Sequence, residues 1–147
     1  MGIENIVATY KQSLTSIDLG GPTLFGPLLI EFRNYVTSIA NRTVYPVLLL
    51  LTDGAIHDMP LTKDTIFELS HLPCSVIIIG VGDADFSAME ELDGDGGRLH
   101  NTRGQPCPRD IVQFVGYNDA VRRGDLAGQV LSEVPKQLVS YMQMRNI

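Results

Sequence analysis

Two predominantly apolar runs, residues 47–51 and 75–81, constrain the fold of this 147-residue chain more than any other feature. A strand with one face in water alternates apolar and polar residues, whereas a run that is apolar throughout is typical of a parallel strand covered on both faces. Residues 111–115 are predicted to form a third strand of this kind. Helical sequence lies between the runs, which predicts an α/β protein with a mostly parallel sheet and helices on both faces.

Apolar residues recur at helical spacing in five further segments, which we predict to be helices: residues 3–14, 24–39, 61–72, 86–92 and 126–142. Thr23 is predicted to be the N-cap of the second helix, and Pro27 fits in its first turn, where a missing N–H costs little. Together the elements predict one domain over residues 1–147, with a three-layer, doubly wound sheet of the Rossmann type.

The polar residues that end the predicted strands indicate where a ligand would bind. Ligands of parallel sheets lie beyond the carboxyl ends of the strands, and Asp53 and Asp83 each follow a strand end. Thr23 lies in the Gly21-Pro22-Thr23 loop, and with Asp53 it offers the hard oxygen ligands that hold Mg²⁺ or Mn²⁺. The alternative for Asp53 is a turn with Gly54, and the N-cap role of Thr23 is compatible with a metal role.

Composition excludes several classes of partner. The formal net charge of −6 and the absence of a basic stripe argue against nucleic acid. No apolar run approaches the roughly 20 residues of a membrane span, and residues 1–5 lack the basic and apolar regions typical of a signal peptide. The chain has no basic patch or cationic amphipathic helix, so no direct membrane contact is expected of it. Cys74 and Cys107 form neither a disulfide framework nor a zinc motif, which favours an intracellular protein.

Six sequence blocks, in order along nearly the whole chain, resemble the copine family. Copines carry two C2 domains that bind phospholipid in response to calcium, followed by a von Willebrand factor A-like domain. The resemblance implies the C-terminal portion of that last domain, lacking the strand that bears an Asp-x-Thr/Ser-x-Ser motif. The blocks are residues 21–27 (GPTLFGP), 51–59 (LTDGAIHDM), 72–82 (LPCSVIIIGVG), 92–95 (LDGD), 109–115 (RDIVQFV) and 131–142 (LSEVPKQLVSYM).

The resemblance also implies a function and a site. Copine domains are non-enzymatic modules that recruit intracellular proteins, so the chain is expected to be cytoplasmic, with membrane recruitment belonging to the full-length protein. Thr23 matches the second metal-site motif of the family and Asp53 the third, and Gly54 and Asp83 are expected to contact partners near the metal. Without the first motif, two ligands are expected to hold Mg²⁺ or Mn²⁺ weakly.

Other functions fit the sequence less well. Plant ubiquitin ligases pair a copine-like domain with a RING finger. The alternative function for this chain is therefore the copine-like module of such a ligase. A series of Cys and His ligands, which a RING finger needs, would distinguish this alternative. His57 and Asp58 are interpreted as loop residues because no nucleophile accompanies them. Asp85 occupies the position of the third glycine of a dinucleotide fingerprint after Gly80-Val81-Gly82, which argues against nucleotide binding.

Two further expectations concern the surface. Six acidic residues lack the spacing of a calcium loop and are predicted to form a solvated turn. They are Asp83, Asp85, Glu90, Glu91, Asp93 and Asp95. If the strand that bears the first motif is missing, the strand over residues 47–51 has an open edge. Because unpaired edges on apolar strands invite association with another chain, self-association through that edge is expected.

Overall fold

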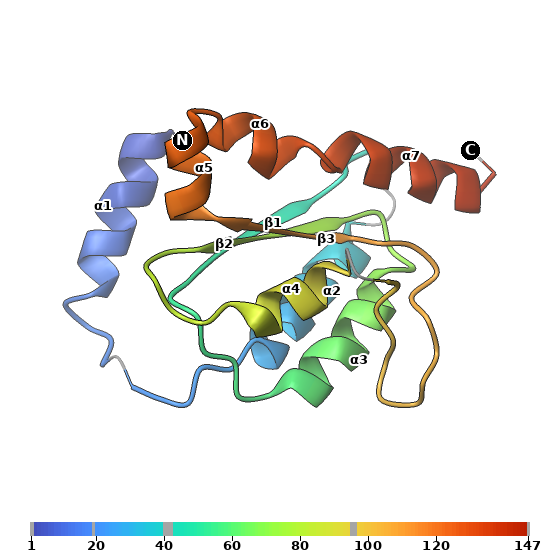
Figure 1. Ribbon diagram of the computed structural model, residues 1–147, viewed down its shortest axis with the longest axis horizontal. Coiled ribbons are helices and arrows are strands. Elements are labelled where there is room, and N and C mark those ends of the chain that lie inside the picture. The colour runs from blue at the N-terminus through green and yellow to red at the C-terminus, as the bar shows by residue number, and fades with distance from the viewer. Residues whose placement is uncertain (1, 19, 40–42, 95–96, 147) are drawn as a thin grey trace.

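A three-stranded parallel sheet forms the centre of the computed structural model, which describes residues 2–18, 20–39, 43–94 and 97–146 (Figure 1). The strands are β1 (Val47–Thr52), β2 (Ser75–Gly80) and β3 (Val112–Gly116), in the order β1-β2-β3. In the register, Leu50 lies beside Ile78, and Ile78 lies beside Phe114. All three predicted strands are therefore confirmed, and so is their parallel pairing.

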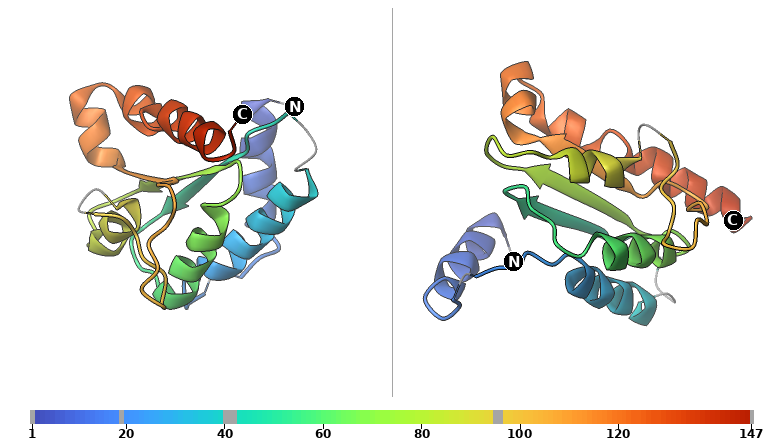
Figure 2. Two further views of the ribbon diagram at one scale, coloured as in Figure 1. Left: turned by 90° about the vertical axis from the view of Figure 1, so that its right-hand side faces the viewer. Right: turned by 60° about the horizontal axis from the view of Figure 1, so that its bottom comes forward.

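Helices cover both faces of this sheet, as the sequence predicts. Helices α2 (Gly26–Ser38), α3 (Met59–Leu69) and α4 (Ser87–Asp93) lie on one face, and α5 (Tyr117–Arg123), α6 (Leu126–Leu131) and α7 (Val134–Met144) lie on the other (Figures 1 and 2). Both crossovers between strands place their helix on the same face, which follows from their shared handedness. Within the described residues, no helix combines the length and the apolar character needed to cross a membrane.

The core lies between β2 and the layer formed by α2, α3 and α4. Every residue of β2 is buried, which explains why its sequence is apolar without interruption. The helices contribute their predicted apolar faces, and large side chains from these three helices and from β2 are almost fully enclosed. They include Leu29, Val36, Ile66, Leu69, Val76, Ile78, Met89 and Leu92.

The segment after β3 differs from the single closing helix that the sequence predicts. It contains α5, which was not predicted, followed by α6 and α7 in place of one helix over residues 126–142. Pro135 lies in the first turn of α7, where the absence of its N–H is tolerated, so it begins a new helix rather than continuing the previous one. The αL conformation of Gly124 ends α5, with a φ of 72°.

Strand β1 is not covered on both faces, which contradicts the prediction from its sequence. The side chains of Val47, Leu49 and Leu51 point away from α2 and α3, and these residues are 41%, 54% and 69% exposed. Helix α1 (Ile3–Ser13) does not cover them, because it stands apart from the sheet and contains no buried residue (Figure 2, right). The layer of helices on this face thus covers β2 and β3 but leaves β1 open.

A buried arginine joins the two helical layers at the amino end of the sheet. Arg109 is 3% exposed, and its guanidinium carbon lies 5.3 Å from the centre of the Tyr141 ring on α7. Its nitrogens donate hydrogen bonds to segments from both sides of the sheet. The acceptors are the backbone carbonyls of Ser70, Leu72, Cys74 and Gln137 and the hydroxyl of Tyr45.

Candidate functional site at the carboxyl edge of the sheet

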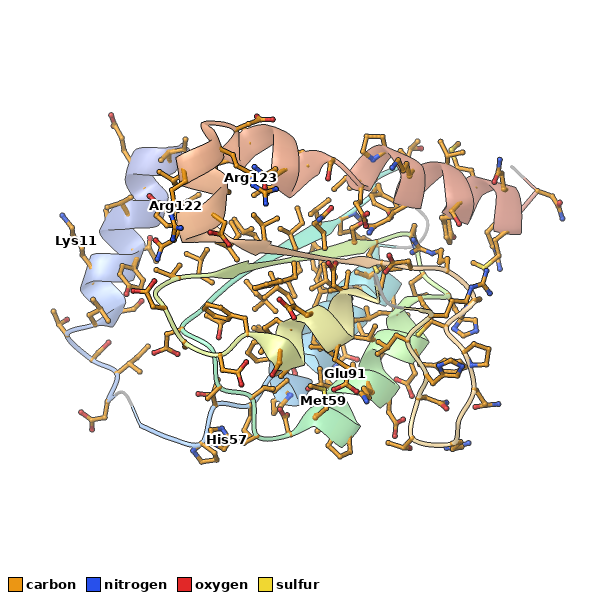
Figure 3. All side chains as sticks on the ribbon, in the orientation of Figure 1. Lys11, His57, Met59, Glu91, Arg122 and Arg123 are labelled. Carbon is orange, nitrogen blue, oxygen red and sulfur yellow. The ribbon has the colours of Figure 1, made fainter. Side chains whose placement is uncertain are left out.

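Three loops meet beyond the carboxyl ends of β1 and β2: residues 20–25 before α2, residues 53–58 after β1, and residues 81–86 after β2. The ends of the two strands are neighbours, since Thr52 lies beside Gly80 in the register. His57 lies beside the segment that leads into α2 (Figure 3). All four residues predicted for a site, Thr23, Asp53, Gly54 and Asp83, belong to these loops. The topology thus brings Asp53, Gly54 and Asp83 to the edge where β1 and β2 end. The contacts of His57 with the backbone of Thr23 bring the loop before α2 to the same edge.

Asp58 caps helix α2 from a different loop. Its Oδ1 accepts a hydrogen bond from the backbone N–H of Phe25 at 2.9 Å, and its Oδ2 accepts one from Gly26 at 2.8 Å. These amides belong to the start of the helix, where backbone N–H groups have no partner within the helix and a negative charge is favourable. The prediction that Thr23 is the N-cap is therefore wrong: the helix starts at Gly26, and Asp58 supplies the capping oxygens.

His57 joins the first two loops next to this cap. Its backbone N–H donates to the carbonyl of Thr23 at 3.0 Å, and its Nδ1 accepts from the backbone N–H of Thr23 at 3.1 Å. His57 and Asp58 are loop residues, as predicted. Their side chains also hold the Thr23 loop in place, which the sequence did not indicate. No local pattern identifies these contacts, since the partners are more than 30 residues apart.

Gly54 holds the second loop against the third. Its φ of 129° favours glycine, and a Cβ at this position would lie 2.6 Å from the Cβ of Ala84. The backbone N–H of Gly54 donates to Oγ1 of Thr52 at 3.3 Å. Gly54 is buried, and because it has no side chain the loops after β1 and β2 can approach each other closely.

Asn118 fixes the third loop from α5. Its Nδ2 donates to Oδ1 of Asp83 at 2.8 Å and to the carbonyl of Gly82 at 3.2 Å. Asp85 accepts from the backbone N–H of Ser87 at 2.9 Å, and hydrogen bonds from the backbone and side chain of Ser87 lower the pKa of this carboxyl. Sequence analysis missed Asn118 because α5 itself was not predicted.

The acidic stretch is only partly a solvated turn. Asp83 and Asp85 are exposed, but Asp93 is 6% exposed and its Oδ1 accepts from the backbone N–H of Phe114 at 2.8 Å. The prediction is therefore wrong for Asp93, which binds the outer edge of β3. Asp95 lies outside the described residues.

The donors that the sequence predicts for a divalent cation at this edge are the hydroxyl of Thr23 and the carboxylate of Asp53. Asp53 is exposed, and within the described part of the chain no residue makes a hydrogen bond to its side chain. Nor do the described residues include a cluster of three or more His, Cys, Asp or Glu side chains arranged to hold a metal. Mg²⁺ requires six oxygens in near-ideal octahedral geometry. Thr23 and Asp53 would supply two of these six oxygens, and water or another group would have to supply the rest.

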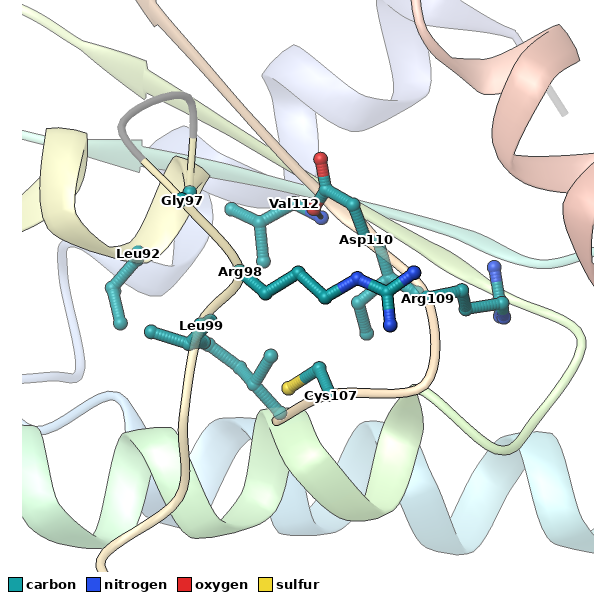
Figure 4. Close-up of a pocket in the computed structure, with 11 residues that line it drawn as sticks. Leu92, Gly97, Arg98, Leu99, Cys107, Arg109, Asp110 and Val112 are labelled. Atoms are coloured by element: carbon teal, nitrogen blue, oxygen red, sulfur yellow. Dashed lines mark hydrogen bonds between the residues drawn. The ribbon is translucent and has the colours of Figure 1, made fainter. Parts of the chain in front are cut away.

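A second hollow lies at the opposite end of β3 and is mainly apolar. This cavity has a volume of about 160 Å³ and is bordered by Leu92, Leu99 and Val112, with Arg98 across its opening (Figure 4). Cys107 lines it, and burial raises the pKa of this thiol. Burial likewise raises the pKa of Cys74 to about 12, so both cysteines remain neutral thiols near pH 7. Cys107 therefore offers no thiolate to this cavity near pH 7.

The comparison with known families agrees with this geometry. The model of the copine domain matches residues 1–147. The chain belongs to the copine family. The predicted fold class is confirmed: a parallel α/β sheet with helices on both faces, of the von Willebrand A-like, Rossmann type, is what a copine domain contains. The edge described above is thus the carboxyl edge of a copine domain.

Proposed function

We propose that this copine domain is a non-enzymatic module for protein–protein interaction, and that partners bind at the carboxyl edge of its sheet. One observation carries the proposal: Asp53 presents an exposed carboxylate that no described residue pairs, in the middle of loops that are otherwise tied together. A free charge at the end of a strand is a natural contact for a partner, whereas paired charges serve the structure of the chain itself.

The fixed loops support this proposal. Asp58 and His57 hold the Thr23 loop, Gly54 packs against Ala84, and Asn118 holds Asp83. A surface that is already ordered loses less conformational entropy when a partner binds. In this proposal Asp53 contacts the partner through its free carboxylate, and Asp83 contacts it while Asn118 holds its Oδ1 in place. Gly54 acts by shaping the surface rather than by touching the partner.

A divalent cation would belong to the complex rather than to the free chain. Thr23 and Asp53 would supply two oxygens to Mg²⁺ or Mn²⁺, and water or an acidic side chain of the partner would supply the others. The expected partners are intracellular proteins, and the expected compartment is the cytoplasm. Recruitment to membranes would come from C2 domains of the kind that copines carry, because this chain has a net charge of −6 and no basic patch.

The decisive experiment compares three forms of the chain. Binding of Mn²⁺ is measured by electron paramagnetic resonance and by the rise of the melting temperature with Mn²⁺ concentration, for the wild type, Asp53→Asn and the control Asp18→Asn. Asp18 is an exposed aspartate outside the three loops. We expect weak binding that Asp53→Asn abolishes and Asp18→Asn leaves intact. Equal behaviour of all three forms would refute the metal role of Asp53.

The interaction role needs a separate readout. Proteins captured from a cell lysate by the wild type are compared with those captured by Asp53→Lys and by the control Asp18→Lys, with quantitative mass spectrometry. We expect a set of proteins that is lost only from Asp53→Lys, because reversing the charge at the edge repels what the carboxylate attracts. Identical sets for both variants would rule out the carboxyl edge as the contact surface.

A further inference from the structure

The cavity at the amino end of β3 reaches into the apolar core. Its volume is about 160 Å³, and its walls come from α3, α4, β3 and the loop that joins α4 to β3. The core side chains that line it, Ile66, Leu92, Ile111 and Val112, are each at most 2% exposed. Protein interiors are closely packed, and voids larger than a water molecule are few. A hollow of this size among core side chains is therefore a feature to explain.

The loop that forms the outer wall is held by its own hydrogen bonds. The N–H of Cys107 donates to the carbonyl of Leu99 at 2.8 Å, and both residues line the cavity. At the tip of the loop, Oδ1 of Asn101 accepts from the N–H of Arg103 at 3.0 Å and from that of Gln105 at 2.9 Å. A cavity persists when its surroundings cannot relax into it, and a loop fixed in this way resists such a collapse.

The same loop is tied to α3, which supplies another wall of the cavity. The backbone N–H of Thr102 donates to Oδ1 of Asp64 on α3, and its hydroxyl donates to Oδ2, both at 2.8 Å. Ile66, two residues further along α3, lines the cavity. The two walls are thus fixed relative to each other, so a ligand would find the cavity already formed.

The opening of the cavity carries polar groups. Gly97, Arg98 and Asp110 are the exposed residues of its lining, and Arg98 extends across the opening (Figure 4). Arg98 forms no ion pair with any residue that the structure describes. Charges of opposite sign at the opening favour a neutral ligand. A guanidinium can donate hydrogen bonds to a carbonyl oxygen and attracts the face of an aromatic ring.

We propose that this cavity binds one phenylalanine side chain of a partner protein, with the ring between the apolar walls and a backbone carbonyl of the partner at Arg98. An apolar cavity of about 150 Å³ can hold benzene, and the volume here is about 160 Å³. Sites for complete small molecules usually measure about 300–1,000 Å³, which favours a single side chain as the occupant. Aromatic side chains that fill pockets are typical anchors of protein interfaces. The proposal does not rest on the proposed function, because Asp53 lies at the carboxyl edge of the sheet.

Nuclear magnetic resonance of methyl groups tests the occupant on the wild-type chain. Benzene and the capped amides of phenylalanine, leucine and alanine are titrated to about 20 mM, a range suited to weak binding. We expect benzene and the phenylalanine amide to shift the methyl signals of Leu92, Leu99 and Val112 along saturable curves. The leucine amide should bind more weakly and the alanine amide should have no effect. The proposal is overturned if benzene and the phenylalanine amide cause no shift, if only benzene binds, or if the leucine or alanine amide acts as strongly as the phenylalanine amide.

Variants test the position and the polar contact. Leu99→Phe places a ring of the chain itself in the cavity and should abolish both titrations, whereas Leu131→Phe, at a 55% exposed position on α6, should bind as the wild type does. Arg98→Gln should weaken the phenylalanine amide about tenfold and leave benzene unchanged. An equal effect on both ligands would refute the role of Arg98.

Circular dichroism verifies that each variant is folded, and the wild-type titrations decide the proposal even if Leu99→Phe does not fold. Asp53→Asn should bind both ligands normally, so a failure of the proposed function is distinguishable from a failure here.

Discussion

The cluster around Arg109 predicts that one buried side chain controls much of the stability of the fold. Its guanidinium donates five hydrogen bonds to acceptors that are all neutral. Two of the carbonyls, those of Ser70 and Cys74, belong to fully buried residues that follow α3 and precede β2. The carbonyl of Gln137 belongs to α7 on the opposite face. Arg109→Met keeps an apolar stem of similar length but removes every donor. The carbonyl of Ser70 then loses the partner that Arg109 supplies, whereas the carbonyl of Cys74 keeps the Tyr45 hydroxyl and that of Leu72 keeps the N–H of Cys74.

The size of the effect follows from two opposing terms. A buried carbonyl left without a donor costs about 1–3 kcal/mol, which applies to Ser70, and the loss of one of the two donors at Cys74 adds about 0.5–1.5 kcal/mol. Removing a buried cation also removes its desolvation penalty, which offsets part of this loss. We expect a net destabilisation of about 2 kcal/mol for Arg109→Met and of about 1 kcal/mol for Arg109→Lys, whose single nitrogen reaches fewer acceptors. The melting temperature should fall by roughly 4–8 °C for Arg109→Met.

Urea denaturation followed by circular dichroism measures these free energies of unfolding, with the slope checked for constancy. The control is Arg33→Met, which removes a surface ion pair with Glu68 whose side chains are 31% and 52% exposed. Exposed pairs contribute about 0–1 kcal/mol, so this control should change little. A loss below about 1 kcal/mol for Arg109→Met, or a loss equal to that of the control, would refute the argument that Arg109 joins the two layers.

Two further predictions concern the loops and the thiols. Asp58→Ala should destabilise the chain by about 1–2 kcal/mol through loss of the α2 cap, whereas Asp53→Ala should change it by less than about 0.5 kcal/mol, as urea denaturation can show. Cys74 and Cys107 should resist iodoacetamide at pH 8–9 until the chain unfolds, as mass spectrometry can follow. Because the folded pKa of Cys74 is raised from 9.0 to about 12, its contribution to stability is full below pH 9 and is lost as the pH rises toward 12. Rapid labelling of the native protein would contradict the burial of both thiols.

The strands and the layers could be predicted because they depend on patterns within a few neighbouring residues. Strand β2 is buried along its whole length, and its uninterrupted apolar sequence is a direct consequence. The order of strands and helices then leaves few topologies, since crossovers between parallel strands have one handedness. The positions of Asp53 and Asp83 at the edge follow from the same rule, because both come directly after strands.

The contacts that fix the site could not be predicted because they join distant segments. Asp58 reaches the start of α2, which lies 32 residues earlier in the chain, and Asn118 reaches a loop 35 residues earlier. A local reading assigned the cap to Thr23, the nearest polar residue before the apolar pattern. Helix α5 was missed for a different reason. It has only seven residues, and Ala120 is its only buried one among those described, so its sequence carries little helical periodicity.

Strand β1 shows why an apolar run does not reveal how many of its faces are covered. Its sequence is as apolar as that of β2, yet one face of β1 and one backbone edge are open in this structure. Apolar side chains favour burial wherever apolar surface covers them, so the pattern does not say which face of the strand is covered. Ile3, Ile6, Val7 and Tyr10 of α1 are apolar and exposed in the same way. The pattern of β1 therefore predicts a strand but not the cover of its two faces, whereas the burial of β2 matches its pattern along the whole strand.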